Sequence, residues 1–236
     1  HLPLLLNTQR KKLGKRDGDV SAESFLAWCL PEALVNFIAL LGWNVSGDQE
    51  IYTTPELVAA FDLARVHAAP AVVDFQKLEW MNGEYIRRRA PAELVASVCA
   101  AVPAAAQADP AFLLRAIALE QPRMKRLTEF PAWYFEPLAI TVPLAWKQTT
   151  PDATRERLQS LYAKLEMLDL WPDTPQEFVA IVKPWIDERG MGVGETLWPM
   201  RVALSGQKAS PSPFELAWLF GKAETLRRLQ YAMAHL

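Results

Sequence analysis

The chain has 236 residues, of which 51% are apolar, and a formal net charge of −2 at pH 7. This length suits one large domain or two small ones, and the composition is typical of a folded soluble protein rather than a disordered or fibrous one. A sequence pI near 6.0 argues against a histone-like protein that coats nucleic acid through overall positive charge.

The chain opens with an apolar run at residues 2–6, which is the best strand candidate in the sequence. The run is too short for a signal peptide, and its positive charges follow rather than precede it. No apolar segment reaches membrane-spanning length, so no membrane association is expected. Because the chain starts at His1 rather than at an initiating Met, we expect it to be a fragment of a longer protein.

Helical spacing dominates the following segments up to Arg89, and strand-like alternation is scarce. The expected helices start at Pro31, at Thr54 and after Asp74, since each of these residues suits a helix N-terminus. Gly83 falls inside the third helix and weakens the prediction that this helix is continuous.

The composition changes after Arg89, where alanine-rich helices fill residues 91–120. A proline-rich stretch at residues 131–151 predicts an irregular connection. Further helices are expected at residues 152–169, 175–189, 195–204 and 213–235, with turns or stops at Gly190, Gly206 and Gly221. The sequence therefore predicts an all-α fold of two packed helical units, at residues 1–89 and 90–236.

The two cysteines, Cys29 and Cys99, lie within apolar helical patterns and lack the Cys or His neighbours of a zinc site. We interpret both as reduced core residues of a cytoplasmic protein, and we expect no bound metal. Most of the nine tryptophans also fall on apolar helix faces, which favours core packing for residues such as Trp80, Trp185 and Trp218.

A basic loop follows the first apolar run and reads Lys12-Leu13-Gly14-Lys15-Arg16. Its two lysines are spaced so that both can reach one polyphosphate. Judged by spacing alone, a solvated basic loop is the stronger interpretation. The segments around the loop decide between the two.

The stretches HLPLLLN, KLGKRDGDV and LPEALVNFIALLGWN resemble the region around the second signature motif of class I aminoacyl-tRNA synthetases. Among these enzymes, the resemblance is to the bacterial glutamyl-tRNA synthetases. The segment at residues 70–87, which ends in Asn-Gly-Glu-Tyr-Ile-Arg, and the stretches PMRVALSG and FELAWLFGKAETLRRL also resemble that family. The resemblance covers essentially the whole chain and is strongest at residues 1–89 and 199–229.

The resemblance implies that Lys12 and Lys15 stabilise the phosphates of ATP and the departing pyrophosphate. Gly14 stands where the family usually has serine, so the parent enzyme is expected to be slower or to use a backbone N–H instead. The N-terminal nucleotide-binding domain with its His-Ile-Gly-His-type motif is expected to be absent. This chain alone should therefore lack ligase activity and should not bind ATP stably.

The resemblance also implies that the second unit is a helical cage around the tRNA anticodon. Arg123 matches the arginine that contacts the third anticodon base, and Arg201 matches a second anticodon-contacting arginine. Ser210 and Pro213 match a loop that lies against the anticodon bases. A planar guanidinium can pair with two base-edge acceptors, which is worth roughly 1 to 3 kcal/mol of discrimination.

The residues leave other interpretations open. Without the resemblance, Arg123 is better explained by a salt bridge to Glu120 or Glu129, and Arg227 and Arg228 by a solvated helix end. A helical protein–protein adaptor and a non-charging paralogue of the synthetase are the alternative functions. The leading prediction is a monomeric, tRNA(Glu)-binding C-terminal part of a glutamate–tRNA ligase, which partners its own N-terminal catalytic domain. Whether the parent also charges tRNA(Gln) stays open.

Overall fold

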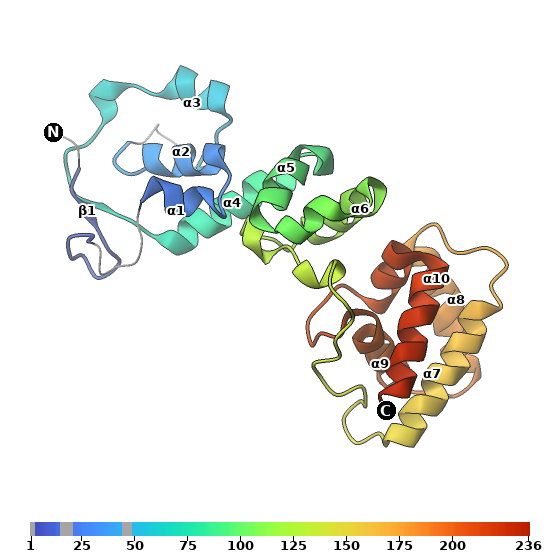
Figure 1. The fold of residues 1–236 in the computed structure, drawn as a ribbon. Coiled ribbons are helices and arrows are strands. Elements are labelled where there is room, and N and C mark those ends of the chain that lie inside the picture. Colours follow the sequence, from blue (N-terminus) through green and yellow to red (C-terminus); the bar gives the residue numbers. More distant parts are fainter. Residues whose placement is uncertain (1–2, 15–20, 44–48) are drawn as a thin grey trace. The chain divides into compact units, whose positions relative to one another are not determined.

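The computed structural model describes residues 3–14, 21–43 and 49–236 (Figure 1). Contacts within the chain group it into two compact units. The first consists of His1–Gln107 with Glu120–Pro131, and the second of Ala108–Leu119 with Ala132–Leu236. The boundary after residue 89 that the composition indicates stays a prediction.

The first unit is built mainly from helices. Its α-helices are α1 (Ala22–Leu26), α2 (Pro31–Ala39), α3 (Thr54–Ala60), α4 (Phe75–Arg88) and α5 (Pro91–Ala101). Its short 3-10 helices are η2 (Leu63–Arg65), η3 (Pro103–Gln107) and η4 (Leu127–Glu129). Two strands of two residues each, β1 (Leu5–Leu6) and β2 (Ala71–Val72), pair in parallel.

The second unit is also helical. Its elements are α6 (Pro110–Glu120), whose last residue belongs to the first unit, η5 (Ala132–Tyr134), α7 (Pro151–Glu166), α8 (Pro175–Glu188), α9 (Val193–Ser205) and α10 (Pro213–Ala234). Figure 1 shows α7 to α10 gathered into one bundle in which α9 and α10 pack side by side. The predicted all-α fold is confirmed, with one small sheet among the described residues.

Local sequence explains where these helices begin. Thr53 and Glu56 form a reciprocal capping box at the start of α3, and the side chain of Asp74 accepts bonds from Gln76 and Lys77 at the start of α4. Proline occupies the first turn of most of the longer helices, where its missing N–H costs nothing.

Two glycines within α4 and α10 affect their helices differently. Gly83 lies within the continuous helix α4. Its position is buried, and a Cβ there would lie 3.2 Å from the carbonyl oxygen of Met124. A small residue is needed for this close approach of two backbones. Gly221 interrupts α10 as expected, because its φ of 74° and ψ of 177° are not helical and form a kink between two helical segments.

The core predictions hold in part. Cys29 is buried, which raises the pKa of its thiol to about 12 and keeps the thiol protonated. Both cysteines are free, but Cys99 is only half-buried. Trp185 is in the core, whereas Trp80 is 39% exposed, so its assignment to the core is wrong. Over the residues described, no helix is long and apolar enough to cross a membrane.

Candidate nucleic-acid interface

The basic loop after β1 begins as a tight reversal of the chain. The Asn7 Oδ1 accepts hydrogen bonds from the backbone N–H groups of Gln9 and Lys11, each at 3.0 Å. Arg10 has a positive φ of 59°, and the Leu13 N–H bonds back to the Leu5 carbonyl at 2.9 Å. These bonds return the chain alongside β1 and leave Lys12 exposed to solvent.

The other predicted lysine, Lys15, lies outside the residues that the structure describes. Gly14 is described. A Cβ at this position would meet nothing closer than the Lys12 carbonyl oxygen at 4.0 Å, and the backbone does not adopt a positive φ there. The fold therefore does not require glycine, and a serine fits the same backbone.

The turn that carries Arg123 is fixed by two buried polar side chains, Asn82 of α4 and Gln121 of the turn itself. The fully buried Asn82 accepts from the Leu30 N–H at 2.9 Å and donates to the Lys125 carbonyl at 2.7 Å. The Gln121 amide donates to the carbonyls of Ile86 and Arg89, each at 2.6 Å. The backbone on both sides of Arg123 is thereby held against α4.

Arg123 itself is exposed at this turn, within the first compact unit. The carboxylate of Glu129, an alternative partner for Arg123, accepts from the backbone N–H groups of Lys125 and Arg126, at 2.7 and 3.1 Å. Glu129 is thus a cap for the following 3-10 helix, η4.

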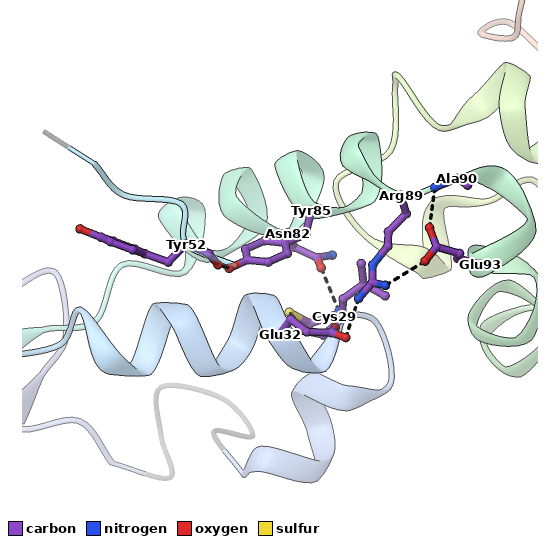
Figure 2. A network of polar contacts seen from close by, with 9 residues as sticks. Cys29, Glu32, Tyr52, Asn82, Tyr85, Arg89, Ala90 and Glu93 are labelled. Carbon is purple, nitrogen blue, oxygen red and sulfur yellow. Dashed lines mark hydrogen bonds and ion pairs between the residues drawn. The ribbon is translucent and has the colours of Figure 1, made fainter. Parts of the chain in front are cut away.

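Charged side chains link α2, α4 and α5 close to this turn (Figure 2). The Arg89 guanidinium bonds to Glu32 at 2.5 Å and to Glu93 at 3.3 Å. Glu93 also accepts from the Ala90 N–H at 2.8 Å, which is the main reason that its pKa is lowered. The end of α4 is therefore anchored to the starts of both neighbouring helices.

Arg201 projects from α9 in the second unit and is held on two sides. Its Nη2 donates to the Lys208 carbonyl at 3.0 Å, and its guanidinium carbon lies 4.9 Å from the centroid of a Trp198 ring. The Nε atom is buried without a partner among the described residues. An arginine that is stacked on indole and only half-buried retains donors for a planar polar ligand.

The loop from Gly206 to Ser212 follows α9 directly. Gly206 ends the helix with a φ of 70°, and a Cβ there would lie 1.9 Å from the Ala139 carbonyl oxygen. The backbone N–H and the hydroxyl of Thr141 both donate to the Gly206 carbonyl, at 3.0 and 2.7 Å. Only glycine satisfies this junction.

The predicted residues Ser210 and Pro213 lie at the far end of this loop. The Ser210 hydroxyl is half-buried and donates to the Pro211 carbonyl at 3.0 Å, which leaves its oxygen able to accept a bond. Pro213 is buried in the first turn of α10, behind the Ser212 cap. Arg201 thus bonds to the loop that contains Ser210, and Pro213 has the position of a helix-starting residue.

Arg228 of α10 supports α9 from inside the bundle. It is only 4% exposed, its Nη1 donates to the Leu204 carbonyl at 2.6 Å, and its Nε pairs with Glu224 at 2.6 Å. A solvated helix end is therefore the wrong interpretation for Arg228, although it fits the exposed Arg227. The expectation failed because Arg228 shares the buried face of α10 with Thr225 and Ala232, at spacings of three and four.

Residues 90–233 match the family model described as "Anticodon binding domain". The chain belongs to this anticodon-binding family. Residues 1–80 match a second model, "tRNA synthetases class I (E and Q), catalytic domain". This second match corrects the expectation that the catalytic domain is absent, because part of it lies within the chain.

Relatives of this anticodon-binding chain include two bacterial glutamate–tRNA ligases. The ligase of Herpetosiphon aurantiacus is 34% identical over 100% of this chain and 50% of its own length. That of Thermus thermophilus is 34% identical over 99% of this chain and 51% of its own length. The chain spans about half the length of these relatives, and the resemblance to glutamyl-tRNA synthetases is confirmed.

Solved structures share the fold of this anticodon-binding chain. A glutamate tRNA ligase from Elizabethkingia meningosepticum superposes with a TM-score of 0.83 at 24% identity, over 100% of this chain and 51% of the other. A glutamate–tRNA synthetase from Elizabethkingia anophelis gives a TM-score of 0.77 at 23% identity, over 99% of this chain and 50% of the other. The described part of the chain contains no cluster of three or more metal-ligating side chains.

Proposed function

We propose that this chain is the tRNA-binding part of a glutamate–tRNA ligase, which attaches glutamate to tRNA(Glu) with ATP. Arg123 and Arg201 read anticodon bases, and the Ser210 oxygen accepts a hydrogen bond at the loop after α9. The chain acts in the cytoplasm as a monomer and depends on the remainder of its catalytic domain for chemistry.

The observation that supports this function best is the setting of Arg201. The arginine belongs to the segment that matches the anticodon-binding family, and it lies between an indole ring and a loop fixed by Gly206. RNA sequence is read mainly on unpaired bases, which stack on planar side chains and bond along their edges. Both modes are available to a guanidinium that is already stacked.

Lys12 and Lys15 have a different role in the proposal. Positive charge on this loop offsets the charge that develops on the phosphates of ATP as pyrophosphate departs. Lys12 is exposed at the edge of β1, within the match to the catalytic-domain model, and this position suits a group that reaches a nucleotide held by the rest of that domain.

Binding of the chain to tRNA(Glu) and to an unrelated tRNA, measured by fluorescence anisotropy at several salt concentrations, tests the proposal. Arg201→Ala and Arg123→Ala should each weaken binding to tRNA(Glu) about tenfold, a loss of roughly 1 to 3 kcal/mol for one base contact, while leaving the unrelated tRNA nearly unaffected. Arg227→Ala is the matched control, because that arginine is exposed and pairs only locally with Glu224.

Equal affinity for both tRNAs, lost in parallel as salt rises, would contradict specific anticodon reading. Such a result would favour a helical adaptor or a non-charging paralogue. In the full-length enzyme, Arg123→Gln should shift the charging preference between tRNA(Glu) and tRNA(Gln). An unchanged preference would remove Arg123 from anticodon reading.

A further inference from the structure

A row of two tryptophans with a cation at each end extends from Arg201 across the second unit. Arg201 stacks on Trp198, the Trp198 ring lies 5.2 Å from the Trp146 ring, and the Lys147 Nζ lies 5.1 Å from the centroid of a Trp146 ring. Trp198 comes from α9, whereas Trp146 and Lys147 come from the irregular connection before α7. Two distant parts of the sequence therefore build one continuous row.

Lys147 adopts a conformation that has an energetic cost. Its φ is 51°, in the left-handed region that non-glycine residues rarely occupy. A hydrogen bond of 2.9 Å from the Thr149 N–H to the Trp146 carbonyl closes the turn around it. The lysine is exposed and forms no ion pair with the part of the chain that the structure describes. A strained, solvent-facing cation is the kind of feature that marks a functional position.

A groove of about 600 Å³ opens beside this turn. Trp146 and Lys147 line it together with Gln148, and α7 and α9 contribute Arg157 and Glu195 to the lining. Arg157 and Glu195 pair with each other, so the positive charge left for a ligand is that of Lys147. An aromatic wall, hydroxyl and amide groups and one cation match a nucleotide, which has a π-face, a polar edge and a phosphate.

Gly194 sets the place of the aromatic wall. A Cβ on Gly194 would lie 2.9 Å from the Trp146 Nε1, closer than real Cβ contacts. The indole therefore lies directly over the first turn of α9, and any side chain at residue 194 would displace it. Because Gly194 has no side chain, the Trp146 indole can occupy this space on α9.

We propose that this groove binds an unpaired nucleotide that neighbours the anticodon base at Arg201. The base stacks on Trp146, and its phosphate is neutralised by Lys147. Trp198 and Trp146, whose rings are tilted by 49° to each other, link this nucleotide to the one at Arg201. The proposal rests on the proposed function, since it requires an RNA loop at Arg201.

The test uses the full chain and a 17-nucleotide stem-loop carrying the glutamate anticodon, with 2-aminopurine at one loop position at a time outside the anticodon. Stacking on Trp146 should quench 2-aminopurine emission at one flanking position. Trp146→Ala should abolish that quenching and weaken binding about tenfold, which lies in the range for loss of one base–aromatic stack.

Two further variants separate binding from folding. Lys147→Gly relieves the strained φ and should leave stability unchanged or raised, yet it should weaken binding about threefold and reduce the salt slope by about 1. Gly194→Ala should raise helix propensity while displacing the indole, so it should also lose the quenching. For Lys147→Gly, stability and affinity then move in opposite directions, which a purely structural role does not produce.

Arg201→Ala is the reference for the proposed function. If Arg201→Ala weakens binding but the Trp146, Lys147 and Gly194 variants bind and quench like the parent chain, the groove proposal is overturned and anticodon reading stands. If Arg201→Ala itself binds like the parent chain, the proposed role of Arg201 fails. Capture of an apolar peptide in the groove, with no effect of RNA, would also overturn the groove proposal.

Discussion

The two loops for which we propose roles in tRNA charging are built in different ways. The loop after β1 is held by its pairing with β1 and by the Asn7 side chain, which accepts hydrogen bonds from the N–H groups of Gln9 and Lys11. Lys12 remains exposed. The loop after α9 is fixed by Thr141 from a distant connection and is supported through α9 by Arg228 from α10. The loop that we propose to read a base is fixed by distant parts of the chain, whereas the loop that we propose to contact the ATP phosphates is held by bonds within its own neighbourhood.

Gly206→Ala should have the largest effect and would break the rigid loop. A Cβ at this position meets the Ala139 carbonyl at 1.9 Å, and the positive φ adds strain, so we expect about 3 kcal/mol or more of lost stability. Urea unfolding followed by circular dichroism measures the loss. Gly190→Ala is the matched control, because its φ is 62° but no atom lies within 4 Å of the added Cβ. That control should lose only about 1 kcal/mol; equal losses would show that the Ala139 contact is unimportant.

Arg228→Ala should come next, with a loss of about 2 to 3 kcal/mol, because it leaves the Leu204 carbonyl and Glu224 without their buried partner. Since this arginine supports the end of α9, affinity for tRNA(Glu) should fall as well. Arg227→Ala, at the adjacent exposed position, should cost less than about 1 kcal/mol. Similar losses for both arginines would contradict the buried role.

The dependence of stability on pH tests the carboxylate that Arg227 and Arg228 share, which is Glu224. The bond from Arg227 is the largest of the interactions that lower the pKa of Glu224 below its ordinary value of 4.5, with Arg228 adding to it. A carboxylate with a lowered pKa stabilises the fold fully above its unfolded value and loses that effect as pH falls through the folded value. The drop in stability below pH 4.5 should therefore be smaller in Glu224→Gln than in the parent chain. Identical acid profiles would contradict this role for Glu224.

Asn7→Ala should weaken the chain by about 1 kcal/mol at most, because the two N–H groups that it releases are exposed and can bond to water. Exchange of the Gln9 and Lys11 amide protons should accelerate while amides of α9 stay protected. A loss of global stability as large as that of Gly206→Ala would show that the fold depends on the loop after β1 as much as on the loop after α9.

Gly14→Ser should have the smallest effect, within about 0.5 kcal/mol in stability, since the backbone there accepts a side chain. In the full-length enzyme, the hydroxyl should raise the rate of adenylate formation, measured by pyrophosphate exchange, if it supplies a bond to phosphate. An unchanged rate would indicate that glycine at this position already suffices. In the same assay, Asn7→Ala removes hydrogen bonds that hold the loop but leaves residue 14 unchanged. It therefore shows how far the rate depends on the conformation of the loop alone.

The sequence was sufficient for local structure. Proline and capping residues such as Asp74 predicted the starts of helices, and the proline-rich connection at residues 131–151 was correctly expected to be irregular. These features depend on neighbours in the chain. Gly206 as a stop also follows from a local rule, since helices commonly end on a left-handed glycine.

Contacts between distant residues were not predictable in the same way. Asn82 and Arg228 look like exposed polar residues by type, and only their positions on apolar helix faces signal burial. The resemblance supplied Arg123, Arg201 and Ser210, whereas Trp146 and Lys147 lie in a connection without periodicity. Their approach to Trp198 depends on how the chain returns to α9, which no local pattern encodes.

Asn82 also constrains the order in which the chain can fold. Its amide nitrogen bonds to the carbonyl of Lys125, 43 residues further along, and the first unit is completed only by residues 120–131. Between α5 and this return, the chain contributes residues 108–119 to the second unit. A chain that ends near residue 107 therefore lacks this carbonyl, and the first unit is complete only after residue 131 has been synthesised.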